Sequence, residues 1–298
     1  MIKSQNMKTN IYNDLLKTKS LDPANVEIFS KSTRDKKNLI VKIDKISGVI
    51  FIEDYFVGNS EYFEGVKGSL IENQNFDDYE NFEDREDSLR RIQHFKNLIL
   101  NKEICDFGCG RGSFLKLAKK YARKVHGVEI QKNYLSLLNL NGINAEQSIQ
   151  NFNTKFDTLF LFHTLEHLPN QIQVLEEIKN YIKPKGKIVI EVPHANEFLL
   201  RNLKLEEFKN FTLWSQHLIL HTKESLTNFL TYSGYKNISI EGIQRYNIAN
   251  HLYWLRHKKP GGHKTDLAKL ETPELVEEYS NSLKKINASD TLIATADV

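Results

Sequence analysis

The amino-acid sequence predicts an α/β fold in which helices cover both faces of a doubly wound, mostly parallel sheet. From Ser88 onwards, short apolar runs typical of buried strands alternate with segments whose apolar residues recur at helical spacing. This alternation indicates parallel strands joined by right-handed helical crossovers. Ligands of such sheets bind beyond the carboxyl ends of the strands, and the polar motifs of this chain follow predicted strands.

Each expected strand is a compact run of β-forming residues. The strands are expected over residues 104–107, 124–130, 144–148, 156–162, 187–192 and 236–241. Pro193 ends the strand that precedes it, because proline cannot donate a ladder hydrogen bond.

The helices between these strands are expected from apolar residues that share a face. One helix presents Ile92, Phe95, Leu98 and Ile99 on its apolar face, and another presents Val174, Leu175, Ile178, Tyr181 and Ile182. Further helices are expected over residues 112–121, 134–140 and 222–233, and a terminal helix or pair over residues 267–287. Pro184 and Gly186 are expected to end the helix that contains Val174 and Ile182. Thr222 is the expected N-cap of the helix over residues 222–233, and Gly234 its expected stop.

Three regions are expected: residues 1–88, a core over residues 89–245, and a C-terminal extension over residues 246–298. In the first, residues 39–43 and 48–52 are predicted to be short strands around a turn. The acidic run over residues 72–87 is expected to be a solvated loop or helix start. The alternative is a lid in which Tyr79 and Phe82 pack on a ligand.

Composition narrows the class of protein. The net charge is +3, from 41 basic and 38 acidic residues, so the sequence predicts no nucleic-acid partner. No apolar run approaches the roughly 20 residues of a membrane helix, and the first residues lack a signal peptide, so a cytoplasmic protein is expected. Cys105 and Cys109 are too few for a disulfide framework or a four-cysteine zinc site.

A glycine-rich turn follows the first core strand. It reads Asp106-Phe107-Gly108-Cys109-Gly110-Arg111-Gly112. Glycine permits positive φ and a close approach of a ligand to the backbone. The glycines are spaced G-x-G-x-G, unlike the G-x-G-x-x-G of dinucleotide enzymes. A carboxylate at Asp106 would repel a pyrophosphate and suits a cationic ligand with an amino-acid end.

A second acid stands at the end of the next strand. Glu129 follows Val125-His126-Gly127-Val128, at the distance from the glycine turn that one βαβ unit spans. A carboxylate there can accept hydrogen bonds from both hydroxyls of a ribose. The alternative is a solvated acid at a strand end.

With these two motifs the chain resembles the class I S-adenosylmethionine-dependent methyltransferases over roughly residues 90 to 240. The resemblance implies a Rossmann-like seven-stranded sheet with N- and C-terminal additions, and S-adenosylmethionine as cofactor. It also implies that Asp106 orients the site and that Gly108 and Gly110 pass close to the methionine part. The implied cofactor-binding set is Asp106, Gly108, Gly110, Gly112, Glu129, Ile130, Ser148 and Phe162, with Glu146 and Gln147 as alternatives to Ser148 near the adenine.

Three polar residues follow the strand over residues 156–162. The spacing of His163, Glu166 and His167 places them on one side of a helical turn. The segment resembles that of small-molecule methyltransferases, including the ubiquinone-biosynthesis O-methyltransferases, which often carry glutamate at the position of His163. A histidine here could be a general base, or the three residues could bind a divalent metal with a distant histidine, or they could brace the loop. We expect no metal.

Two more histidines are candidates for the base. His194 follows the strand that Pro193 ends, and His217 lies in an aromatic stretch with Phe211 and Trp214. These aromatic residues could line an acceptor pocket or pack on the core. The predicted catalytic set is therefore His163, His167, His194 and His217.

The C-terminal part suggests an acceptor. Asn250-His251-Leu252-Tyr253-Trp254-Leu255, Pro260-Gly261-Gly262-His263 and the segment over residues 290–294 resemble methyltransferases associated with bacterial surface-glycan biosynthesis. The resemblance implies a saccharide or nucleotide-sugar acceptor. Related sugar C-methyltransferases carry an N-terminal cysteine-ligated zinc module, which is absent here, so O-methylation is favoured and a homodimer is possible.

Other classes remain open at this point. C- or N-methylation of another small molecule is one alternative, and a NAD-dependent sugar-modifying enzyme is another. The glycine spacing, Asp106 and the lack of a Tyr-x-x-x-Lys pair argue against the NAD enzyme. An inert binding module is disfavoured because both anchoring acids are present.

Overall fold

The computed structural model describes residues 9–58 and 82–298. Its centre is a seven-stranded sheet with the order β10-β11-β8-β7-β4-β5-β6. The strands are β4 (Glu103–Phe107), β5 (Lys124–Val128), β6 (Asn144–Glu146), β7 (Phe156–Phe162), β8 (Ile182–Pro193), β10 (Lys236–Ile243) and β11 (Thr291–Asp297). The five strands from β6 to β8 are parallel, and β11 is antiparallel to both its neighbours.

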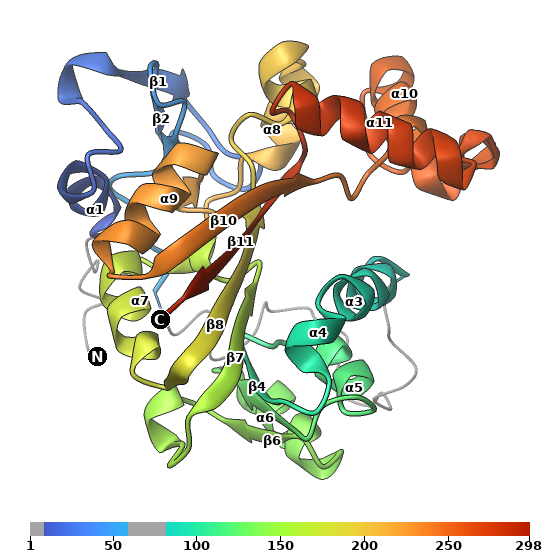
Figure 1. Ribbon diagram of the computed structural model, residues 1–298. Coiled ribbons are helices and arrows are strands. Elements are labelled where there is room, and N and C mark those ends of the chain that lie inside the picture. The colour runs from blue at the N-terminus through green and yellow to red at the C-terminus, as the bar shows by residue number, and fades with distance from the viewer. Residues whose placement is uncertain (1–8, 59–81) are drawn as a thin grey trace.

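Helices cover both faces of this sheet (Figure 1). One face carries α3 (Phe82–His94), α4 (Lys96–Ile99), α5 (Ser113–Ala118) and α6 (Lys132–Leu140), which bury their apolar residues in one core cluster. The other face carries α1 (Ile11–Lys17), α7 (Gln171–Lys179) and α9 (Lys223–Tyr232), which belong to the larger cluster. The predicted Rossmann-like α/β fold with a seven-stranded, mostly parallel sheet is confirmed.

A second, antiparallel sheet stands beside the carboxyl end of β8. It comprises β1 (Val26–Ser30), β2 (Val41–Asp44), β3 (Ile50–Phe51) and β9 (Ile219–Leu220). The predicted strand pair around residues 45–48 is therefore present as β2 and β3. A single parallel bridge between His194 and His221 connects β9 to the residue after β8.

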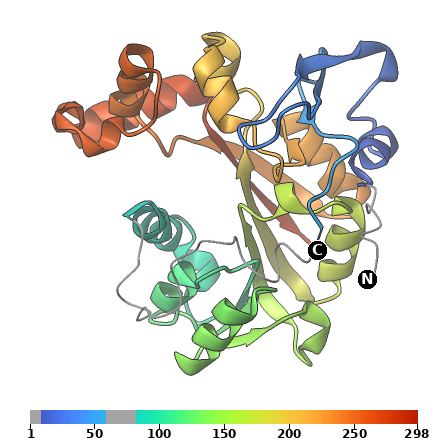
Figure 2. The same ribbon diagram turned by 180° about the vertical axis from the view of Figure 1, so that it is seen from behind.

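Three further helices gather at one end of the molecule. Both views show α8 (Glu206–Thr212) between the small sheet and the pair α10 (Ile248–His257) and α11 (Pro273–Lys285) (Figures 1 and 2). Short helical turns are η1 (Pro23–Asn25), η2 (Ile149–Asn151), η3 (Leu165–His167), η4 (Phe198–Asn202), η5 (Gly262–Lys264) and η6 (Asp266–Leu270). Rings of Phe208 and Phe211 on α8 pack against Trp254 on α10, with centroids 5.1 and 5.2 Å apart. This contact ties α8 to the C-terminal segment.

The helix ends follow from local chemistry. The Thr222 hydroxyl accepts a hydrogen bond from the amide of Ser225, and the side chain of Ser225 accepts one from the amide of Thr222, so α9 begins with a capping box. Gly234, which follows α9, has φ of 78°. The expected N-cap and stop of this helix are therefore confirmed.

Two expectations need correction. The helix α7 ends at Lys179, not at Pro184, because Ile182 already pairs in parallel with Phe156 as the first residue of β8. The segment over residues 290–294 was expected only as a family signature, but it supplies the first four residues of β11. Thr291, Leu292 and Ala294 are buried there between β8 and β10.

Some expectations are outside what the structure describes. Most of the acidic run over residues 72–87, including Tyr79, lies outside the described residues, as does the side chain of Phe82. The boundaries at residues 88 and 245 stay predictions. In the described ranges no helix is long and apolar enough to cross a membrane.

Candidate functional site

The glycine turn joins β4 to α5 with three left-handed residues. Gly108, Gly110 and Gly112 have φ of 80°, 54° and 76°. A Cβ at Gly108 would lie 2.4 Å from the Thr164 hydroxyl oxygen, and one at Gly112 would lie 2.3 Å from Leu138 Cδ2. A Cβ at Gly110 would meet no atom within 4 Å. Gly108 and Gly112 therefore allow close packing, whereas Gly110 keeps open space beside the turn.

The two anchoring acids lie next to each other at the ends of β4 and β5. Asp106 is 3% exposed, and its Oδ1 is buried without a hydrogen-bond partner among the described residues. Burial raises its pKa to about 7, against the lowering effect of Arg91. Glu129 is 5% exposed, and its Oε1 accepts a 2.7 Å hydrogen bond from the amide of Gln131. Burial raises the pKa of Glu129, although the amides of Gln131, Gly110 and Ile130 lower it.

A buried charge network lies beneath these acids, and sequence reasoning missed it. The fully buried Glu191 of β8 accepts hydrogen bonds from Arg90 and Arg91 of α3, at 2.9 and 2.7 Å from its Oε1. Burial raises the pKa of Glu191, but Arg91, His163 and Arg90 hold it well below its usual range. The only available signal was an acid inside the apolar strand over residues 187–192.

Arg245 extends this network to the end of β10. Its guanidinium is paired with Asp87 of α3, and its Nη1 lies 3.1 Å from His163 Nε2. The pKa of Arg245 is raised because Asp87 outweighs the effect of burial. The network therefore joins α3 to both β8 and β10 at the carboxyl edge of the sheet.

His163 is part of this network. It has φ of 50°, an unusual value for a residue other than glycine. Its Nδ1 lies 3.3 Å from Glu166 Oε1, and its Nε2 lies 3.2 Å from Glu191 Oε1. Burial and Arg245 lower its pKa, but the hydrogen bonds to Glu166 and Glu191 raise it overall. Both ring nitrogens are therefore engaged by protein groups.

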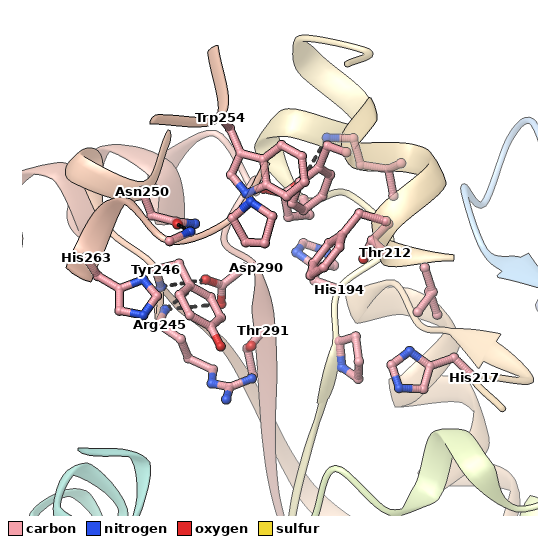
Figure 3. A pocket seen from close by; sticks show the side chains of 18 of the residues that line it. His194, Thr212, His217, Arg245, Tyr246, Asn250, Trp254, His263, Asp290 and Thr291 are labelled. Atoms are coloured by element: carbon pink, nitrogen blue, oxygen red, sulfur yellow. Dashed lines mark hydrogen bonds between the residues drawn. The ribbon is translucent and has the colours of Figure 1, made fainter. Parts of the chain in front are cut away.

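A cavity of about 580 Å³ opens beyond the ends of β8 and β11. Figure 3 shows His194 and His217 on one side of it, and Arg245, Tyr246 and His263 on the other. Phe208, Phe211 and Trp254 supply aromatic surface, and Arg34, Glu197, Asn250 and Asp290 supply polar groups. We call this cavity the acceptor cavity. Its lining comes from five separate stretches of the chain.

His194 differs from His163 in having one unengaged nitrogen. The side chain is 2% exposed, its Nδ1 lies 2.9 Å from the carbonyl oxygen of Ser289, and its Nε2 has no hydrogen-bond partner among the described residues. A carbonyl can only accept, so Nδ1 carries the proton and Nε2 carries the lone pair. Burial lowers the pKa to about 4, which keeps the imidazole neutral at pH 7.

His167 and His217 form a separate group with Glu166. The rings of the two histidines are 5.0 Å apart, and each also packs edge-on against Trp214. His167 Nδ1 lies 2.9 Å from the carbonyl oxygen of Gln216. Phe211 is exposed on α8 beside Trp254, and both line the acceptor cavity. The four predicted histidines are therefore distributed among three different environments.

The other predicted cofactor residues fall into two groups. Ile130 and Ser148 are half-buried at the ends of β5 and β6. The side chain of Phe162 is buried against Phe95 and Phe114, with Arg91 4.3 Å above its ring. Only its backbone can therefore face a ligand at the end of β7. These roles stay predictions.

Comparison with known proteins assigns the core. Residues 79–240, more than half of the 298, match a family described as a methyltransferase domain. The chain belongs to this family. Its core is a class I S-adenosylmethionine-dependent methyltransferase domain.

Curated relatives and solved structures agree with this assignment. An alignment of 142 positions, covering 43% of this chain, shows 25% identity to a ubiquinone biosynthesis O-methyltransferase from Hydrogenovibrio crunogenus. An alignment of 160 positions, covering 49% of this chain, shows 22% identity to a tRNA U34 carboxymethyltransferase from Nautilia profundicola. These matches span 59% and 51% of the two relatives. A methyltransferase crystal structure from Archaeoglobus fulgidus shares the fold, with a TM-score of 0.51 at 19% identity over 72% of this chain and 94% of that one.

The residues of this methyltransferase fit the cofactor that the family implies. The unpartnered Oδ1 of Asp106 can accept from the ammonium group of an amino acid, because a buried carboxylate oxygen needs a donor. Glu129 is a carboxylate at the end of β5 that could accept hydrogen bonds from ribose hydroxyls, and Gly110 leaves space beside the turn. Asp106, Gly110 and Glu129 are therefore the residues that would hold S-adenosylmethionine.

Proposed function

We propose that this methyltransferase acts on a hydroxyl group of a small, negatively charged molecule bound in the acceptor cavity. A sugar or nucleotide-linked sugar is the favoured class. When bound, S-adenosylmethionine supplies a methyl group on a positively charged sulfur, which the hydroxyl oxygen displaces to leave S-adenosylhomocysteine. The chain has to orient the hydroxyl, take its proton and exclude water.

The observation that carries the proposal is His194, which lines the cavity and whose buried Nε2 has no hydrogen-bond partner among the described residues. The Ser289 carbonyl holds the ring as the tautomer with its lone pair on Nε2. The hydroxyl proton would pass to this nitrogen. With a pKa of about 4, His194 is unprotonated at neutral pH but is a weak base. A negatively charged acceptor in the cavity would raise this pKa and bring it nearer to the operating pH, where a general base works best.

The lining of the cavity supports an anionic acceptor. Burial raises the pKa of Glu197 to about 8, so this side chain is neutral at pH 7. Arg34 lines the cavity with its guanidinium 4.5 Å from the ring centroid of Trp214. Within the described residues it makes no salt bridge, although the charge of the neighbouring Asp35 acts on it. A phosphate or carboxylate would find a partner in Arg34, because guanidinium groups bind these oxyanions in a bidentate manner.

The same lining supports a hydroxylated acceptor. The rings of Phe208, Phe211 and Trp254 offer flat apolar surface, and Asn250 and Thr291 offer hydrogen-bonding groups beside it. This combination suits a sugar ring, which has apolar faces and polar edges. The curated relatives above do not include a sugar methyltransferase. The O-methylation in the name of one of them agrees with a hydroxyl acceptor.

A screen with the purified full chain tests the proposal. Formation of S-adenosylhomocysteine would be measured with nucleotide-linked sugars, sugar phosphates, neutral sugars, phenols and tRNA. We expect turnover with a phosphorylated sugar and much less with its neutral counterpart. Turnover confined to tRNA or to neutral phenols would contradict the proposal. The absence of a nucleic-acid partner, the cytoplasmic location and the homodimer stay predictions.

A further inference from the structure

A second group of chemically active side chains lies beside the acceptor cavity, outside the proposed reaction. Glu166 and His167 belong to η3 after β7, and His217 belongs to the connection between α8 and β9. One ligand atom from each residue lies within 4.8 Å of the other two. We call these three residues the His–Glu cluster. A backbone hydrogen bond of 2.9 Å from Leu218 to Glu166 holds its two segments together.

Two atoms of the cluster are buried without a hydrogen-bond partner among the described residues. They are Oε2 of Glu166, whose side chain is 0% exposed, and Nδ1 of His217. An unpartnered buried polar atom of this kind costs about 1–3 kcal/mol, so it calls for an explanation. A cation placed between the two would accept a lone pair from each.

The protonation states are those of metal ligands. Burial raises the pKa of Glu166, but His163, His167 and His217 lower it to about 2, so the carboxylate is charged. Burial, reinforced by His167, lowers the pKa of His217 to about 3, so its imidazole is neutral. His167 donates from Nδ1 to the Gln216 carbonyl, as metal-binding histidines commonly donate their second nitrogen to the backbone.

We propose that Glu166, His167 and His217 bind one divalent transition-metal cation. Two imidazoles and one carboxylate favour zinc or a similar ion over magnesium or calcium, which prefer oxygen ligands. Bonds of about 2.1 Å at tetrahedral angles place ligand atoms about 3.4 Å apart. Since no pair of ligand atoms is more than 4.8 Å apart, each pair has to close by at most about 1.4 Å, which side-chain rotation can supply.

Three protein ligands leave a fourth position open. His217 also lines the acceptor cavity, so the proposed site adjoins the space assigned to the acceptor (Figure 3). An acceptor oxygen or a water molecule could complete the coordination. The sequence offered a metal site in which His163 was one of the ligands. In the site proposed here, His163 is not a ligand, because its Nδ1 contacts Glu166 Oε1.

The test uses the full chain, freed of metal with a chelator, and the metal alone. Calorimetric titration with ZnCl2 should show one equivalent bound, and CoCl2 should give the visible absorption of a four-coordinate site with nitrogen and oxygen ligands. Glu166→Gln and His217→Asn should each weaken zinc binding at least about 100-fold, since loss of mere outer-shell partners already costs 10–100-fold. His257→Asn, which removes an exposed histidine on α10, should leave zinc binding unchanged.

Three results would overturn the site: no zinc binding tighter than millimolar, a cobalt spectrum of the six-coordinate aquo type, or equal zinc affinity in Glu166→Gln and the parent. Circular dichroism would show whether the variants fold. If neither does, the cobalt spectrum of the parent chain decides the question. No cofactor or acceptor is present in these titrations, so their outcome is independent of the proposed O-methylation.

Discussion

The cofactor end and the acceptor end of this methyltransferase are assembled in different ways. Asp106, Gly110 and Glu129 lie within 24 residues of sequence, and parallel pairing of β4 with β5 brings them together. The acceptor cavity takes Arg34, His194, Asn250 and Asp290 from segments that only the complete fold joins. On the assignments proposed above, a compact βαβ unit holds the cofactor, and segments distant in sequence hold the acceptor.

The sharpest way to separate the two ends is to remove the proposed base. His194→Gln should lower kcat by about 10²–10⁴-fold, the usual contribution of a positioned base, and leave S-adenosylhomocysteine affinity unchanged. His163→Asn is the contrasting variant. It should lower stability as well as activity, because it removes a partner of both Glu166 and Glu191. A His194→Gln enzyme with full kcat would show that the base lies elsewhere.

The opposite separation comes from the cofactor end. Asp106→Asn and Glu129→Gln should each weaken S-adenosylhomocysteine binding by about 10–100-fold, because a hydrogen bond to a charged group contributes about 1.5–3 kcal/mol. Asp157 lies at the start of β7, at the opposite end of the strands from the glycine turn, and pairs with Lys183. Asp157→Asn is therefore the matched control and should keep full affinity. Equal binding by all three variants, measured by calorimetry, would remove the assigned roles of Asp106 and Glu129.

Two alanine variants in the glycine turn, with a third elsewhere as a control, sharpen the comparison. Gly108→Ala should lower the free energy of unfolding by about 1–3 kcal/mol, because its Cβ would clash with Thr164 in addition to the strain of positive φ. Gly110→Ala should cost only the strain, about 1 kcal/mol, but weaken cofactor binding. Gly142→Ala, with φ of 67°, controls for strain away from the site. Denaturant unfolding and calorimetry would measure both effects, and equal losses in all three variants would contradict this account.

Cofactor binding should depend on pH through Asp106. In the free protein this carboxyl has a pKa of about 7, so it is mostly protonated at pH 6 and mostly ionised at pH 8. The ammonium group of the ligand needs the ionised form. Affinity for S-adenosylhomocysteine should therefore rise as pH increases, approaching tenfold per unit below pH 7. In Asp106→Asn the dependence should vanish, and an identical slope in that variant would assign the titration to another group.

The smallest expected effect concerns Arg34. This side chain is exposed at the rim of the acceptor cavity. Arg34→Gln should raise KM for an anionic acceptor about fivefold, since exposed ion pairs contribute up to about 1 kcal/mol. The KM for a neutral acceptor should not change. Arg256→Gln, on the exposed side of α10, is the control.

The fold could be predicted from the sequence, and the residues proposed for the cofactor end could be picked out, because their signals are local. The strand over residues 104–107, the glycine turn and Glu129 are contiguous patterns with one structural solution. β11 was missed because its antiparallel place between β8 and β10 is determined by pairing over about 100 residues. The role of Glu191 was missed because its partners Arg90 and Arg91 lie 101 and 100 residues away. Of four equivalent candidate histidines, only tertiary contacts distinguish His194.

The most direct test of this account is calorimetric titration of S-adenosylhomocysteine into the parent chain, His194→Gln and Asp106→Asn at pH 7.5, with NADH as the competing ligand class. The account predicts the same micromolar affinity for the parent and His194→Gln, binding at least tenfold weaker for Asp106→Asn, and no binding of NADH. Loss of affinity in His194→Gln would contradict the separation of the two ends. Binding of NADH in place of S-adenosylhomocysteine would contradict the assignment of the glycine turn itself.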